Sequence, residues 1–190
     1  MIKILVAITL FYFSACQKIN TLQNKISRDA ITKELVWDMD MNEQGYSNTK
    51  AVVHTIKGSF TMKFYSLLAP KSSEKVINLI QKGYFDGGNV SRSFKNYILQ
   101  FGGTNKRASN EGAFANLFEF NSIQHILGSV GLVIKDGKNW ENEKPEIYIS
   151  MTTLPHLDHK FTVFAQVTEG LDVVEKLKLN DQILKIELKN

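Results

Sequence analysis

The stretch NVSRSFKNYILQFGG, residues 89–103, is the part of the chain that says most about its fold. Polar residues around Arg92 lead into an apolar run that ends at Gln100, and two glycines close the stretch. Most arginines lie on the protein surface, and a core strand rarely holds an arginine and a glutamine at its ends. Arg92 and Gln100 are therefore either ordinary surface residues or the polar end of a pocket.

The segment before this stretch predicts a hairpin and then a helix. In AVVHTIKGSFTMKF, residues 51–64, two apolar runs meet at Lys57 and Gly58, and the second run alternates as a strand with one buried face does. Residues 68–85 follow with Pro70 where a first helical turn accepts it, Glu74 near the positive N-terminal end, and Gly83 after the last turn. A helix of about three turns is expected there.

The segments after this stretch predict more strands and a second helix. Short apolar runs occur at residues 130–134, 146–151 and 161–167. The residues Leu171, Val174 and Leu177 share one face of a helix, and Leu184, Ile186 and Leu188 alternate as in a final strand. Many short strands with only two helices predict a β-barrel or sandwich with helices at its ends.

The N-terminus has the pattern of an exported lipoprotein. Lys3 is followed by an apolar run over residues 4–13 and by small residues before Cys16. Such a run rises about 15 Å as a helix, half of a bilayer core, so it is too short to span a membrane. It fits a secretory signal, and the alternative is a buried N-terminal strand with an incidental cysteine. The stretch FSAC also resembles the lipobox of bacterial lipoproteins, which implies that Cys16 is acylated and becomes the mature N-terminus.

Three regions are therefore expected: a lipoprotein signal peptide over 1–15, a tether with a possible extension over 16–47, and the main domain over 48–190. The apolar residues between 35 and 41 pack on the domain as an extra strand or helix, or belong to the tether, and both options stay open. Gln17 after the cysteine is not the aspartate that marks inner-membrane retention. The expected location is the bacterial cell envelope, with a lipid anchor in the outer membrane.

Composition excludes several functional classes. The chain has 190 residues, 43% hydrophobic and 22% charged, as in a globular protein. Its net charge of +4 is spread along the chain, so no nucleic-acid partner is expected. The single cysteine cannot form an intramolecular disulfide or a cysteine-based zinc site. His156 and His159 flank Asp158, but two histidines in one turn make a weak metal site, and none is expected.

The order of these segments resembles the cyclophilin-type peptidyl-prolyl isomerases, especially bacterial members, from about Val52 to the C-terminus. The similar stretches are APKSSEKVINLIQKGYFDGG, NVSRSFKNYILQFGG, LFEFNSIQHILGSVGLVIKDGK and PEIYISMTTLPHLDHKFTVFAQVTEGLDVVEKL. The resemblance implies a mainly β fold, a closed antiparallel eight-stranded barrel capped by two α-helices. It also implies rotation about X-Pro peptide bonds, which assists the folding of exported proteins.

The resemblance assigns roles to nine residues. It places the catalytic arginine at Arg92 and the neighbouring glutamine at Gln100. It places the substrate-binding positions at Tyr97, Ile98, Glu146, Tyr148, His156, Leu157 and Phe161. The expected partners are proline-containing peptides or unfolded exported proteins, with no cofactor, and a monomer is expected.

The chemistry of the reaction accounts for these residue types. The barrier to rotation about an X-Pro amide is about 20 kcal/mol, because the nitrogen is conjugated with the carbonyl. Lowering it needs an apolar slot for the proline ring and a fixed donor that favours the twisted amide. Arginine is such a donor, because it is always charged and carries several N–H groups in a rigid fork.

Several positions depart from the family pattern. Glu146 stands where the family has a glutamine that binds the substrate backbone, and it could pair with Arg92. Ser91 replaces a usual histidine, and His159 stands in the place of a turn glycine. Residues 131–146 replace the usual alanine- and asparagine-rich strip of the groove. The sequence thus favours an active isomerase, and the alternative is a cyclophilin-fold binding module with little or no activity.

Overall fold

The short apolar runs form one antiparallel sheet in the computed structural model, which describes residues 49–102, 118–119, 121–133 and 145–189. The eight strands are ordered β3-β4-β6-β5-β7-β2-β1-β8. Their bounds are β1 Lys50–Thr55, β2 Gly58–Phe64, β3 Asn89–Phe94, β4 Ile98–Gly102, β5 Ser129–Leu132, β6 Glu146–Ser150, β7 Val163–Glu169 and β8 Ile183–Lys189. All described residues belong to one unit of the chain, Glu43–Asn190, and the predictions for residues 1–47, Cys16 included, lie outside the described residues.

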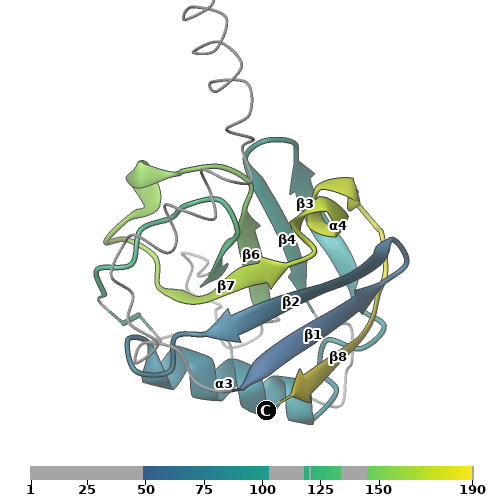
Figure 1. Ribbon diagram of the computed structural model, residues 1–190, viewed down its shortest axis with the longest axis horizontal. Helices are drawn as coiled ribbons and strands as arrows, with labels where there is room; N and C mark the ends of the chain where they lie inside the picture. Colours follow the sequence, from purple (N-terminus) through teal and green to yellow (C-terminus); the bar gives the residue numbers. More distant parts are fainter. Residues whose placement is uncertain (1–48, 103–117, 120, 134–144, 190) are drawn as a thin grey trace, which may run out of the picture. The chain divides into compact units, whose positions relative to one another are not determined.

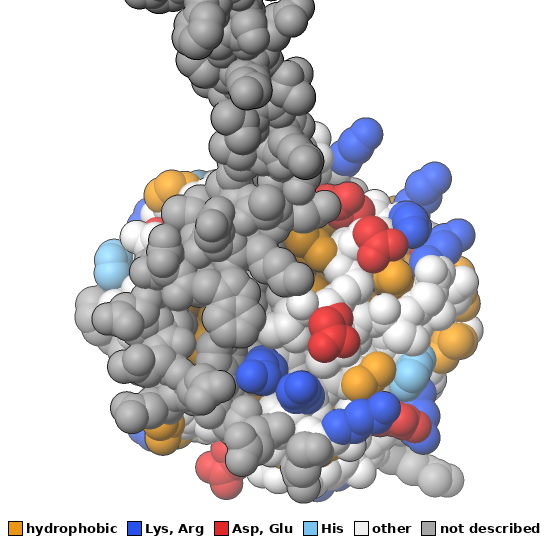
Figure 2. Space-filling view, viewed as in Figure 1, with side chains coloured by type: hydrophobic (Ala, Val, Ile, Leu, Met, Phe, Trp, Pro, Cys, Tyr) orange, Lys and Arg blue, Asp and Glu red, His pale blue; other side chains and the backbone are white. Residues whose placement is uncertain are grey.

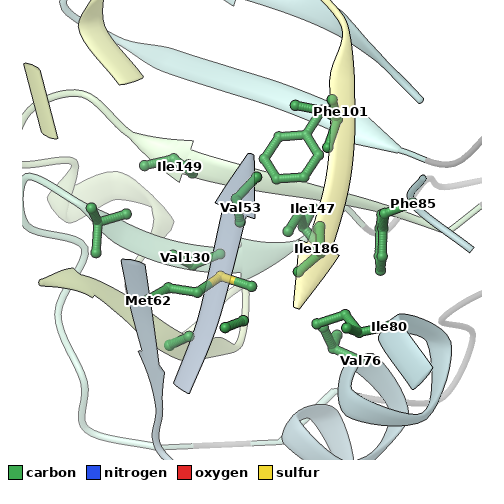
Figure 3. Packing of buried hydrophobic residues seen from close by; sticks show 14 of the residues in the cluster. Val53, Met62, Val76, Ile80, Phe85, Phe101, Val130, Ile147, Ile149 and Ile186 are labelled. Atoms are coloured by element: carbon green, nitrogen blue, oxygen red, sulfur yellow. The ribbon is translucent and has the colours of Figure 1, made fainter. Parts of the chain in front are cut away.

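The sheet curls around an apolar core, and the helices lie at its ends (Figure 1). Helix α3, Pro70–Gln81, contacts β7 and β8, whereas the shorter α4, Leu171–Lys176, contacts β2. Alternate residues of each strand point inward, as the period of two requires. Side chains from all eight strands, α3 and the segment after it belong to this core. Figure 3 shows part of it, including Val53, Met62, Val76, Phe85, Phe101, Val130, Ile147 and Ile186.

The two edges of the sheet approach each other at one end. Asn89 and Gln182 form an isolated bridge, and the Ile183 N–H donates to the Gly88 carbonyl at 2.7 Å. Between the described residues of β3 and β8 the pairing is limited to this end of the strands. The mainly β architecture with two α-helices is confirmed, and full closure of the barrel stays a prediction.

Helix α3 begins and ends largely as its sequence indicates. Pro70 lies in the first turn, and Gly83 follows the C-cap with φ of +63°. The Gly83 N–H donates to the Ile80 carbonyl and the Tyr84 N–H to the Leu79 carbonyl, the paired bonds of a Schellman motif.

The expectation that Glu74 supplies the negative charge at the start of α3 is wrong, because Glu74 lies beyond the first turn. The carboxylate comes instead from Glu119. It accepts from the backbone N–H groups of Lys71 and Ser72, at 3.0 and 2.7 Å, and from the Ser72 hydroxyl. This contact satisfies two N–H groups that a helix start leaves unpaired.

Two expectations about individual strands need correction. In β2, Phe60, Met62 and Phe64 are buried as expected, but Thr61, on the opposite face of the strand, is buried as well. In β8 the register shifts, so that Thr55 faces Ile183 while His54 faces Lys185. This bulge leaves Leu184 without a partner and 48% exposed, whereas Ile183 enters the core.

The described surface mixes charges of both signs. Figure 2 shows Lys and Arg side chains interspersed with acidic and hydrophobic ones over the visible face. Within the part of the chain that the structure describes, no helix has the length and apolar character needed to cross a membrane.

Candidate active site

Strand register brings the predicted catalytic residues into one row. Arg92 of β3 faces Gln100 of β4, Gln100 faces Tyr148 of β6, and Tyr148 faces Gly131 of β5. Directly opposed residues of neighbouring strands lie on the same face with their Cβ atoms about 4.5–5.5 Å apart. The inward neighbours Leu99 and Ile149 belong to the core, so this row lies on the outer face of the curled sheet.

A bulge in β3 turns Arg92 toward this row. Val90 faces Phe101 and is fully buried, and the register then shifts between Val90 and Arg92. With regular alternation Arg92 would share the core face with Val90, because residues i and i+2 point the same way. The extra residue, Ser91, moves Arg92 to the outer face. The Ser91 hydroxyl donates to the Gln100 backbone carbonyl at 3.3 Å.

The guanidinium of Arg92 rests on an aromatic ring beside the row. Its Cζ atom lies 4.7 Å from the ring centroid of Phe94, the next residue on the same face of β3. Phe94 in turn faces Ile98, a predicted residue of the proline slot. Arg92 is exposed, so its N–H groups are accessible to a bound peptide next to that slot.

Gln100 and Glu146 form a hydrogen-bonded pair. The Gln100 amide donates to the Glu146 carboxylate, and Gly102, opposite Glu146, leaves room because a Cβ there would lie 2.6 Å from the Glu146 Cγ. Burial and the Glu146 charge raise the pKa of Tyr84 to about 12. Among the described residues no ion pair joins Glu146 to Arg92, so Arg92 is not neutralised by this carboxylate.

Tyr148 is the most enclosed of the predicted slot residues. Its side chain is 3% exposed, and its ring meets that of Phe161 edge to face, with centroids 6.4 Å apart. A Cβ at Gly131 would lie 2.3 Å from the tip of the Tyr148 ring, so the glycine makes the space for the tyrosine hydroxyl. Burial raises the pKa of Tyr148 well above its ordinary value.

The remaining predicted slot residues come from the β3–β4 turn and from η4, the short helix Pro155–Leu157. The Tyr97 ring is stacked on the His156 ring, with centroids 6.0 Å apart, and Tyr97 Oη lies 3.1 Å from His156 Nε2. The Phe161 N–H donates to the Leu157 carbonyl at 3.2 Å. His159 adopts φ of +60°, the left-handed conformation that favours glycine, so the family glycine that the resemblance implies here fits the backbone.

Sequence reasoning missed one residue of this region, His125. It is fully buried, and its Nε2 lies 2.7 Å from Tyr148 Oη, while its Nδ1 lies 2.8 Å from Asp158 Oδ1. In the sequence, Asp158 stands out only as a member of a weak metal site with His156 and His159. Among the described residues no group of three potential metal ligands occurs. The available signal in the sequence is Tyr148 itself, because the hydroxyl of a buried tyrosine needs a hydrogen-bond partner.

Comparison with known proteins identifies the family. Residues 50–187, most of the chain, match the sequence model of one protein family. That family is described as cyclophilin type peptidyl-prolyl cis-trans isomerase/CLD. The chain belongs to the cyclophilin-type peptidyl-prolyl cis-trans isomerase family.

Individual relatives support this assignment. The chain is 28% identical over 137 residues to peptidyl-prolyl cis-trans isomerase-like 1 of Aspergillus niger, covering 69% of this chain and 82% of that protein. It is 27% identical over 142 residues to a peptidyl-prolyl cis-trans isomerase of Synechococcus elongatus, covering 74% and 96%.

Solved structures share the fold. A cyclophilin-type isomerase of Cryptosporidium parvum matches with a TM-score of 0.61 at 16% identity, covering 75% of this chain and 98% of that one. A second crystal structure of that protein, determined in the presence of the dipeptide Ala-Pro, matches with a TM-score of 0.57 at 14% identity, covering 74% and 99%.

Proposed function

We propose that this chain catalyses rotation about X-Pro peptide bonds with Arg92 as the donor to the twisted amide. The observation that carries the proposal is the bulge at Ser91, which puts Arg92 in register with Gln100 and Tyr148 on the outer face. The apolar side of the slot is formed by Ile98, by Tyr148 and by the η4 segment, Pro155–Leu157, which is called the wall below. The proline ring would lie against this apolar side. No nucleophile, metal or cofactor is needed, since the reaction forms and breaks no covalent bond.

Gln100 supports Arg92 in this proposal. Its amide is committed to Glu146, so its side-chain carbonyl is the remaining polar atom on the row, and a carbonyl can accept from a guanidinium or a substrate N–H. Glu146 therefore orients Gln100 in this chain, where the family has a second glutamine that contacts the substrate.

The experiment is an isomerisation assay with a short X-Pro peptide for wild type, Arg92→Ala and Arg92→Lys. Loss of the donor in Arg92→Ala is expected to lower kcat/KM about 100-fold, because one transition-state donor is worth about 3 kcal/mol. Arg92→Lys is expected to restore little, since an ammonium lacks the planar fork. Lys57→Ala, a cation in the β1–β2 turn, is the matched control and should match wild type.

A folded wild type that does not exceed the uncatalysed rate would contradict the proposal. The alternative of a peptide-binding module would then be favoured, and Glu146 in place of the family glutamine is the feature that supports it. Binding of the same peptide without turnover would distinguish the two functions.

We also propose that the natural substrates are unfolded or exported proteins of a bacterial cell envelope, reached by a monomer anchored through Cys16. The signal-like run over residues 4–13 and the FSAC stretch support this location. Mass spectrometry of the membrane fraction should find a lipid-modified N-terminal cysteine at position 16. Cys16→Ala should abolish this modification and the anchoring, and an unmodified wild-type chain would contradict the proposal.

A further inference from the structure

His125 forms hydrogen bonds at both ends of the η4 segment, which is one wall of the proposed proline slot. Its backbone carbonyl accepts the Leu154 N–H at 2.8 Å, just before η4, and its backbone N–H donates to Asp158 Oδ1 at 2.7 Å, just after η4. The segment between these two contacts carries His156 and Leu157. One buried residue thus fixes where the wall segment begins and where it ends.

The side chain of His125 also contacts Tyr148, which forms the floor of the proposed slot. Its ring is stacked near the Tyr148 ring, with centroids 5.9 Å apart and 13° between the planes. Its Nδ1 lies within hydrogen-bond distance of Asp158 Oδ1, and its Nε2 lies within hydrogen-bond distance of Tyr148 Oη. The array Tyr148–His125–Asp158 therefore joins floor and wall through a single imidazole.

The chemistry of the partners orders the protons in this array. A carboxylate only accepts, so Nδ1 of neutral His125 carries the proton and donates to Asp158. Nε2 is then the acceptor, and the Tyr148 hydroxyl donates to it. Burial lowers the pKa of His125 against the opposing effect of Asp158, which favours this neutral state. The Tyr148 hydroxyl is thereby directed away from the proline slot, and the ring of Tyr148 is left to contact it.

We propose that His125 and Asp158 are positioning residues of the proline slot, which keep the Tyr148 floor and the η4 wall at a fixed separation. This inference rests on the proposed function, because the slot is taken to be the proline-binding part of the isomerase site. Neither residue touches the substrate. Their contribution is to ground-state and transition-state binding of the proline ring alike, so their loss should appear in KM and leave kcat nearly unchanged.

The test is steady-state kinetics of the full chain with an X-Pro peptide, together with calorimetric titration of the same peptide. Asp158→Ala removes both contacts to His125 and is expected to raise KM about tenfold with kcat within about twofold, the effect of one or two lost hydrogen bonds. Asp158→Asn keeps an acceptor oxygen and should return KM to within about twofold of wild type. Asp172→Ala, at an exposed aspartate of α4, is the matched control and should leave both constants unchanged.

Tyr148→Phe provides the second variant, in case Asp158→Ala fails to fold. It keeps the ring and removes the hydroxyl. KM is expected to rise about threefold, because Tyr148 loses its hydrogen bond to the His125 imidazole. An unchanged KM in either folded variant, or an equal fall of kcat in both, would overturn the inference. If wild type does not accelerate isomerisation, the proposed function fails, and the titrations still decide whether the array positions a proline-binding slot.

Discussion

Arg92 and Tyr148 lie two strands apart in one row, yet the structure holds them in opposite ways. Arg92 is exposed and is supported by a bulge and by the half-exposed ring of Phe94. Tyr148 is enclosed by Gly131, Phe161 and His125 and has almost no exposed surface. In the proposed reaction the donor must be open to a peptide that arrives from solvent, whereas a wall that grips a ring gains from rigidity. The site therefore combines an exposed polar side and a fixed apolar side.

Among the changes that test this comparison beyond Arg92 itself, the largest effect is expected from Gly131→Ala, which alters the fixed apolar side. The new Cβ would lie 2.3 Å from the Tyr148 ring, so the ring must move. Overpacking of this kind costs about 1–3 kcal/mol of unfolding free energy, and we expect kcat/KM to fall about tenfold or more. Urea unfolding and the isomerisation assay measure the two effects.

Gly87→Ala is the matched control for that substitution. No heavy atom lies within 4 Å of a Cβ at Gly87, but its φ of +72° penalises a side chain. It should cost about 1 kcal/mol of stability and leave kcat/KM unchanged. An equal loss of activity in both variants would contradict the view that Gly131 is needed for its space.

An intermediate effect is expected from pH, again on the fixed side. Burial lowers the pKa of His125 below its ordinary value near 6.5, so the unfolded chain binds the proton more readily than the folded one. Its contribution to stability is fully present above the unfolded pKa and is lost as the pH falls through the folded pKa. Unfolding free energy should therefore decrease from pH 7.5 toward 5.5, measured by urea titration. His125→Gln should flatten this slope, and an unchanged slope would contradict the assignment.

The smallest effect is expected on the exposed polar side, from Phe94→Leu. It removes the ring beneath the Arg92 guanidinium, an interaction worth about 0.5–1 kcal/mol at exposed sites. We expect kcat/KM to fall about two- to fivefold with thermal stability unchanged. Phe94→Tyr keeps the ring face and should match wild type. A loss as large as that of Arg92→Ala would contradict this prediction, because it would mean that Arg92 acts only with the Phe94 ring beneath it.

The same contrast explains what the sequence could predict. The hairpin and both α-helices were predictable, because the spacing of apolar residues within a segment indicates its secondary structure. The family was predictable because its motifs keep their order along the chain even where single residues differ. The bulge at Ser91 was not, since a one-residue register shift leaves no mark in the apolar pattern of so short a strand. The same limit explains the wrong expectation for Leu184, where another bulge interrupts the alternation.

Contacts between distant segments were also beyond sequence reasoning. Glu119 contacts the start of α3 across a large sequence separation, so the sequence favours the nearer Glu74, which is wrong. The sequence groups Asp158 with its neighbours His156 and His159, whereas its hydrogen-bond partner in the fold is His125. In both cases side chains of the right chemistry were visible, and only the fold decides which of them meet.

The pairing of the first strand of the sheet with the last has a consequence for biosynthesis. β1 lies between β2 and β8. Its Lys50 pairs directly with Lys189, although nearly the whole sequence of the domain separates the two residues. A ribosome delivers β8 only after every other element has been made, so a nascent chain cannot complete the sheet during synthesis. Closing so long a loop is entropically costly and slows folding. The chain would then stay incompletely folded until β8 can pair with β1.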